Sequence, residues 1–310
     1  MKSKIGGEMM LFAIALIWGT AIVAQRYGMD FIGPFAFNGG RMVIGFLVLI
    51  PLILFLDSRG KKAPHFDEKI YKERKVSQRK DLVIGAIACG GVLFVASTLQ
   101  QVGLIYTTAG KGGFITALYI VIVPLAGIAL RKKVRAITWG CVLLAVIGLF
   151  LLSVSESFSI NKGDILMLVC AVGFAGHILA TDYFVARVDN TILLSCLQFL
   201  VAAIFSVPFM CVYEDVTIQA FKAAAFPLLY LGIMSSGVAY TLQMVAQKRV
   251  DPTMTSLIVS FESVVAVIAG IILLGETINT REMMGCVFMF VAIIVSQLPS
   301  KDESLNKKLG

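Results

Sequence analysis

The sequence of 310 residues contains little charge and little histidine. Only 15% of its residues are charged, against roughly 25% in ordinary soluble domains, and it has two histidines. It lacks the HExxH, GxSxG and GxxxxGK[ST] motifs, which carry metalloprotease chemistry, serine hydrolysis and P-loop ATP hydrolysis. The sequence therefore predicts a protein that is not an enzyme and that needs no metal or cofactor.

Cysteine is scarce and is not arranged for cross-linking. The six cysteines form no CxxC pair, and all of them fall inside apolar stretches: Cys89, Cys141, Cys170, Cys196, Cys211 and Cys286. This pattern predicts neither a disulfide framework nor a structural zinc site.

Apolar residues dominate instead, at 58% of the sequence with a mean hydropathy of +0.88. A helix of about 20 apolar residues crosses the ~30 Å core of a bilayer. Ten runs approach this length: 8–28, 33–56, 82–105, 112–130, 137–153, 163–186, 191–212, 223–246, 253–274 and 282–298. We therefore expect an all-α integral membrane protein with ten transmembrane helices, the first of which is retained and not cleaved as a signal peptide.

The net charge of +8 follows the positive-inside rule. If both termini are cytoplasmic, 21 of the 27 basic residues fall in cytoplasmic segments, nine of them between Arg59 and Lys80. The basic charge therefore orients the chain and does not indicate binding to nucleic acid. It predicts a multi-pass protein of the cell membrane with both termini in the cytoplasm.

The sequence also contains a weak internal repeat. Residues 33–55 resemble residues 190–212 at an offset of 157, which pairs Arg41 with Gln198, and residues 98–100 match 241–243 at an offset of 143. The pattern divides the chain into halves 1–153 and 154–310, each with five predicted spans, the second ending in a short cytoplasmic tail. Because five is odd, the second half is inverted, and inverted repeats place a substrate site between them near the midplane.

Three stretches carry a family resemblance. The sequences "LIWGTAIVAQ" (16–25), "TTAGKGGFITALYIVIVPLAGIAL" (107–130) and "SLIVSFESVVAVIAGIILLGETI" (256–278) resemble the EamA-type branch of the drug/metabolite transporter superfamily, and the resemblance covers residues 8–298. It implies a secondary transporter that exports a small metabolite such as an amino acid or amine. Ser263 stands where the family often has proline, and Arg131-Lys132 replaces a Gly-Glu pair, so the substrate stays open.

Glu262 is the most unusual residue, because a charge at bilayer depth costs about 2.5–3.5 kcal/mol on insertion scales. At 1.5 Å per residue it lies ~13 Å from one face, and Arg41 lies ~12 Å from the other, so the two approach the same depth. They either form a structural pair or bind the charged ends of a substrate. Glu262 is also the candidate for proton coupling, since desolvation opposes its charge and a nearby Arg41 favours it.

The other candidate substrate-binding residues are polar or aromatic residues within predicted spans: Trp18, Gln100, Lys111, Tyr119, His177, Tyr240 and Gln243. Five of these residues also have a structural alternative. Trp18 can be core packing, Lys111 a snorkelling interfacial lysine, and His177 a hydrogen-bonded structural residue in place of a proton relay. The two glutamines can hydrogen-bond between helices in place of lining a polar path.

The predicted function is secondary transport of a small molecule across the bilayer by alternating access. A passive facilitator or channel, or a non-transporting membrane subunit, remains an alternative. Coupling to protons stays open, and small residues one turn apart are compatible with a monomer or a homodimer.

Overall fold

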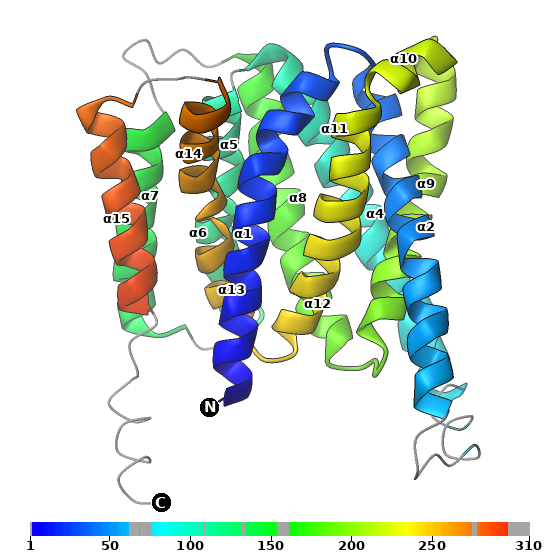
Figure 1. Ribbon diagram of the computed structural model, residues 1–310. Coiled ribbons are helices and arrows are strands. Elements are labelled where there is room, and N and C mark those ends of the chain that lie inside the picture. The colour runs from blue at the N-terminus through cyan, green and yellow to red at the C-terminus, as the bar shows by residue number, and fades with distance from the viewer. Residues whose placement is uncertain are drawn as a thin grey trace, which may run out of the picture.

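The computed structural model describes residues 2–61, 68, 73, 76–107, 109–131, 134–153, 161–274 and 278–296, and within these residues it contains helices and no strands. The helices form one bundle (Figure 1). Eight of them are long and apolar enough to cross a membrane. The expected all-α membrane architecture is therefore confirmed. The count of ten stays a prediction, because the two remaining candidates, the apolar stretch Ala136–Leu152 and the helix Thr280–Ser296, have only 17 residues each.

The helices of the first half coincide with the predicted spans. They are α1 (Lys2–Gly28), α2 (Pro34–Lys61), α4 (Arg79–Tyr106), α5 (Ala109–Ala117), α6 (Tyr119–Ala129) and α7 (Ala136–Ser153). Within α2, Pro51 occupies an interior position. Neighbouring helices and side chains can satisfy the backbone groups that a proline frees inside a membrane, so proline does not end the span here.

The second half begins with a capping box, in which the side chain of Asn161 and that of Asp164 each accept from the other residue's backbone N–H. Its elements are α8 (Lys162–Val185), α9 (Thr191–Tyr213), α10 (Ile218–Ala223), α11 (Ala225–Tyr230), the π-helix η1 (Leu231–Tyr240), α12 (Thr241–Gln247), α13 (Pro252–Val259), α14 (Glu262–Leu274) and α15 (Thr280–Ser296). Asp251 caps α13, with Pro252 at its first position.

The packing brings the two halves together along the whole bundle. Helix α2 packs on α9, α1 packs on α13, α14, η1 and α12, and α4 packs on both α8 and α9. The largest buried cluster combines apolar residues of both halves, among them Ile14, Ile120, Leu257 and Met289. The centre of the bundle is therefore built from both halves.

Two apolar spans are interrupted part-way along their length. Leu118 separates α5 from α6, and Ser260 with Phe261 separates α13 from α14. The hydroxyl of Ser260 donates to the carbonyl of Leu257 at 2.7 Å, a back-bond that favours bending of a helix. Irregular backbone inside a membrane is tolerated where it is buried in protein or lines a cavity. We therefore expect both interruptions to lie in the interior of the bundle.

Helices α7 and α15 pack chiefly on each other. Both lie at one edge of the bundle in Figure 1. A Cβ added to Gly148 would lie 2.8 Å from the carbonyl oxygen of Gly285, and one added to Gly285 would lie 2.6 Å from that of Gly148. Glycine at both positions permits this close crossing.

The N-terminus of α2 is held by a carboxylate from the other half. Both oxygens of Glu214 accept hydrogen bonds, from the backbone N–H groups of Phe35 and Ala36, each at 2.8 Å. A negative charge here also complements the helix dipole. Gly33 leaves room for the carboxylate, since a Cβ at this position would lie 2.3 Å from it. Glu214 thereby fixes the start of the helix that carries Arg41.

We expect Glu214→Ala to lower the thermal stability of the protein. Loss of a helix cap of this kind costs roughly 0.5–2 kcal/mol, because two buried backbone donors lose their acceptor. Thermal unfolding in detergent measures the effect. The matched control is Asp215→Ala, which removes an adjacent exposed carboxylate. Equal melting temperatures of the two variants would show that the cap does not stabilise α2.

Some sequence interpretations fall outside the described residues. These include Gly275 and Glu276, near the end of the third stretch that carries the family resemblance, and most of the basic segment between residues 59 and 80. Lys111 lies in α5, but its side chain is also outside the described part of the chain.

Candidate functional site

A cavity lies where α1, α2, α4 and α8 meet the two interrupted spans and the π-helix. Its lining comprises Trp18, Ala21, Ile22, Gln25, Arg41, Gln100, Thr116, Tyr119, Phe174, His177, Ile178, Ser235, Tyr240, Gln243, Val259 and Glu262. Its volume is about 60 Å³, taken as the space open to the centre of a water-sized sphere. One water needs roughly 10–15 Å³ by this measure, so the cavity suits a small molecule.

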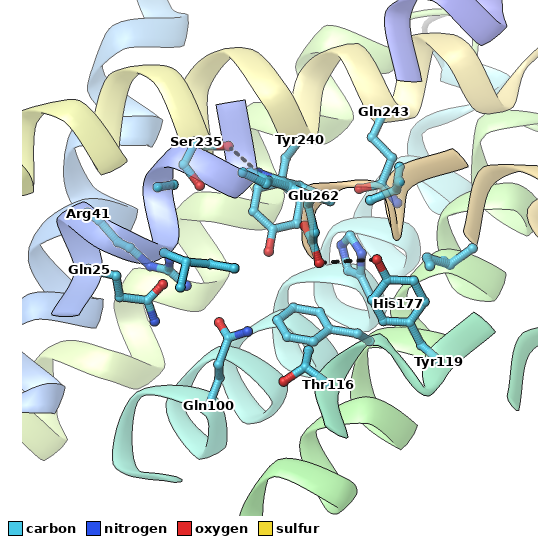
Figure 2. A pocket seen from close by; sticks show the side chains of 16 residues that line it. Gln25, Arg41, Gln100, Thr116, Tyr119, His177, Ser235, Tyr240, Gln243 and Glu262 are labelled. Atoms are coloured by element: carbon cyan, nitrogen blue, oxygen red, sulfur yellow. Dashed lines mark hydrogen bonds between the residues drawn. The ribbon is translucent and has the colours of Figure 1, made fainter. Parts of the chain in front are cut away.

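Arg41 projects from α2 into one end of the cavity (Figure 2). Its side chain is 3% exposed. The Nε atom donates to Oδ1 of Asn38 at 3.1 Å, and Asn38 in turn donates to Thr98 at 3.0 Å. The Nη2 atom has no hydrogen-bond partner among the described residues. Asn38 thus orients a buried guanidinium that retains unused donor capacity.

Glu262 is the first residue of α14 and lines the cavity near the middle of the view in Figure 2, to the right of Arg41. The hydroxyl of Tyr119, the first residue of α6, donates to Oε1 of Glu262 at 3.2 Å. Its position in the first turn of a helix favours a carboxylate. The two residues that follow the helix interruptions are therefore in direct contact.

Arg41 and Glu262 line the same cavity, yet no ion pair within 4.0 Å joins them. The sequence places them at similar depth and leaves open whether they pair or bind a substrate. In the structure, the partner of Glu262 is Tyr119, and that of Arg41 is Asn38. The two charges stay separate within one cavity.

Three rings form a wall across the cavity. The rings of Trp18 and Tyr240 lie 4.7 Å apart between centroids, and those of His177 and Tyr240 lie 5.6 Å apart, edge to face. The indole N–H of Trp18 donates to the backbone carbonyl of Ser235 in the π-helix at 3.4 Å. Aromatic faces of this kind pack on apolar parts of a ligand and attract cations.

Two glutamine side chains that line the cavity already donate hydrogen bonds to other glutamines of the protein. Gln25 donates to Gln101, and Gln243 donates to Gln247 at 3.1 Å. Within the part of the chain that the structure describes, the Oε1 atom of Gln243 has no hydrogen-bond partner, although the residue is 1% exposed. Such an amide keeps an acceptor available at the cavity wall.

His177 is 1% exposed and lines the cavity. Its Nε2 atom lies 2.9 Å from Oε1 of Gln198, the residue equivalent to Arg41 in the repeat. This contact gives His177 a defined structural partner.

Eight of the nine candidate residues line the cavity, and the side chain of the ninth, Lys111, lies outside the described residues. Sequence reasoning missed Gln25, Thr116 and Ser235 as lining residues. Gln25 follows Trp18 by two helical turns, so helical periodicity places both on one face of α1. Ser235 had no such signal, because it contributes through its backbone carbonyl.

The described residues include no group of three or more His, Cys, Asp or Glu side chains arranged to hold a metal ion. The side chains that line the cavity offer charge, hydrogen bonding and aromatic contact.

Comparison with protein families gives a match over most of the chain. The model of the EamA-like transporter family matches residues 5–154 and again residues 161–297. An uncharacterized transporter of Archaeoglobus fulgidus is 28% identical over 298 residues, covering 95% of this chain and 87% of its own length. The threonine/homoserine exporter RhtA of Escherichia coli K12 is also 28% identical, over 97% of this chain and 94% of its own.

A crystal structure with 17% sequence identity superposes with a TM-score of 0.74, covering 94% of this chain and 96% of the other. At this identity the likeness concerns the fold alone.

Proposed function

We propose that this chain, which belongs to the EamA-like transporter family, carries a small metabolite across the membrane by alternating access between two inverted halves. The observation that carries the proposal is the cavity, because its lining combines side chains of both halves with a buried cation and a carboxylate. Charged residues inside a membrane protein typically mark a substrate or ion pathway.

The two halves are residues 1–153 and 154–310, with five transmembrane helices each. Three observations support this division. The family model matches twice, once in each half. The fourth span of the first half and the corresponding span of the second are both interrupted. At the offset of 143, Leu118 corresponds to Phe261 and Tyr119 to Glu262, so the interruptions coincide.

The packing is also compatible with a symmetric relation between the two halves, in which equivalent helices make equivalent contacts. Helix α1 packs on α14 as α8 packs on α6, while α2 with α9 and α7 with α15 pair equivalent helices. Discontinuous helices at the interface between inverted repeats are a recurring feature of transporter sites. Rocking of one half against the other would expose the cavity alternately to each side.

The orientation we propose places both termini on the cytoplasmic side of the cell membrane. The distribution of Lys and Arg supports it through the positive-inside rule. The start of α1 and the end of α15 lie at the same end of the bundle, as expected for an even number of crossings (Figure 1).

The substrate class we propose is an amino acid or amine, and the direction is export. The named function of RhtA, a threonine/homoserine exporter, supports both points. The size of the cavity supports a small substrate.

Counterflow in proteoliposomes of the purified protein tests the proposal. We expect a labelled substrate to accumulate transiently against unlabelled substrate inside, with saturation, because a carrier returns loaded faster than empty. A channel gives flux without counterflow, and a non-transporting subunit gives no flux. Preloading with individual amino acids and amines identifies the substrate, and protein-free liposomes provide the background.

The same vesicles test proton coupling through Glu262. If Glu262 binds a proton during the cycle, an imposed pH gradient drives substrate accumulation. Flux that ignores the gradient rules this coupling out and leaves a facilitator.

A further inference from the structure

We propose that the cavity selects a zwitterion, with the substrate carboxylate at Arg41 and its ammonium group at Glu262. This inference rests on the proposed transport function and narrows its substrate from amines and amino acids to compounds that carry both charges. It starts from the two charged groups of the cavity and from what each of them lacks.

Arg41 has no counter-charge among the described residues. It makes no ion pair with any of them, and its Nε atom donates to the neutral side chain of Asn38. Burial of a charge without a partner is costly, yet here Asn38 and the surrounding packing hold the guanidinium in place. An anion entering the cavity would remove this cost. The planar guanidinium favours a carboxylate, which it can bind through two parallel hydrogen bonds.

The surroundings of Arg41 suit a carboxylate as well. Gln25 and Gln100 lie at the same end of the cavity as Arg41 in Figure 2. Their amide groups can donate to oxygen atoms that the guanidinium does not reach. The described residues at this end bring no acidic side chain into the cavity lining, so nothing there repels an anion.

Glu262 has no cationic partner in the part of the chain that the structure describes. Its Oε1 atom accepts a hydrogen bond from the neutral hydroxyl of Tyr119. A carboxylate has about four acceptor positions, so capacity for further donors remains. An ammonium group carries three donors, and the rings of Trp18 and Tyr240, which line the same cavity as Glu262, can attract a cation. This end of the cavity therefore suits an amine.

The separation of the two charges decides between ligand classes. If Arg41 and Glu262 formed an ion pair, each would neutralise the charge of the other, and a neutral ligand could bind without leaving a buried charge unpaired. Because they do not, a ligand with a single charge leaves one of them buried without a partner. A zwitterion satisfies both, and the limited cavity volume restricts it to a small one.

The first test uses the unmodified protein. Thermal unfolding of the purified full-length protein is measured with glycine, alanine, serine, threonine and homoserine, and with the carboxamide and N-acetyl derivative of each. We expect at least one amino acid to raise the melting temperature, and both of its derivatives to bind about tenfold or more weaker, since each loses a hydrogen-bonded charge. A carboxamide or N-acetyl derivative that binds as tightly as its parent overturns the proposal.

The second test assigns the carboxylate to Arg41. In Arg41→Gln we expect the amino acid and its carboxamide to bind equally, while the N-acetyl derivative remains weaker. Arg26→Gln is the matched control, because Arg26 is exposed in the last turn of α1. A full preference for the carboxylate in Arg41→Gln contradicts the assignment. If this variant fails to fold, the derivative series on the unmodified protein still decides the substrate class.

The outcomes separate this inference from the proposed function. Counterflow of an amine or a neutral compound, together with no binding of any amino acid in the panel, overturns the zwitterion assignment and leaves transport intact. Amino acid binding without flux of any compound overturns transport and retains the assignment of the two charges.

Discussion

Glu262→Gln weakens binding of the stabilising amino acid by roughly tenfold to a hundredfold, while the unliganded variant melts near the temperature of the wild type. The expected loss corresponds to one hydrogen bond to a charged group, about 1.5–3 kcal/mol. In the wild type, the hydroxyl of Tyr119 donates a hydrogen bond to the carboxylate of Glu262. We expect the variant to keep its fold, because the side-chain carbonyl of glutamine can accept the same hydrogen bond. Thermal unfolding with and without ligand measures both quantities.

Tyr119→Phe is the comparison for this prediction. It removes the hydroxyl that contacts Glu262 and leaves the negative charge, so we expect a smaller loss of affinity. If Glu262→Gln unfolds the protein, or leaves the stabilisation by ligand unchanged, the carboxylate has a structural role and does not bind the substrate.

The second large effect concerns the contact between α1 and α14. A Cβ added to Gly19 would lie 2.5 Å from Cβ of Val265 and 2.6 Å from the carbonyl oxygen of Glu262. The backbone of α14 cannot yield as a flexible side chain would. We therefore expect Gly19→Ala to lower stability, with an overpacking cost of typically 1–3 kcal/mol, and to weaken ligand binding by displacing Glu262.

The repeat supplies a matched control for Gly19→Ala. Gly176 is its equivalent at the offset of 157, but a Cβ at Gly176 would meet only Cγ1 of Val92, at an ordinary 3.7 Å. Gly176→Ala should therefore keep or slightly raise stability, because alanine favours a helix over glycine by about 1 kcal/mol. Thermal unfolding and ligand binding are compared in the two variants. Equal loss of stability in both would show that the α1–α14 contact is not the cause.

The sequence predicts which residues of the cavity are unusual, because a charge such as Arg41 or Glu262 stands out in an apolar stretch. It does not predict how they are arranged. Counting residues along a helix gives the depth of a side chain but neither the rotation nor the lateral position of the helix. The structure is therefore needed to show that the two charges remain separate, with Asn38 and Tyr119 as their partners.

The helical content follows from hydropathy, since the described residues of each predicted apolar range lie largely on one or more helices. The interruptions do not follow from hydropathy, because Leu118 and Phe261 are apolar residues in apolar stretches. The composition of residues 231–240 likewise does not indicate the π-helix that ends at Tyr240. Its course depends on neighbours such as Trp18, whose indole contacts the carbonyl of Ser235. Such features arise from packing between distant segments.

The close crossing of α7 and α15 bears on the order in which the chain is assembled. Helix α7 has α15 as its principal neighbour, and the two glycines that meet are Gly148 and Gly285. During synthesis, α7 enters the membrane long before that neighbour exists. Until then, its glycine-bearing surface faces lipid or transient partners. The first half of the protein therefore completes its packing only when the last described helix has been inserted, which makes this pairing a late and non-local step of folding.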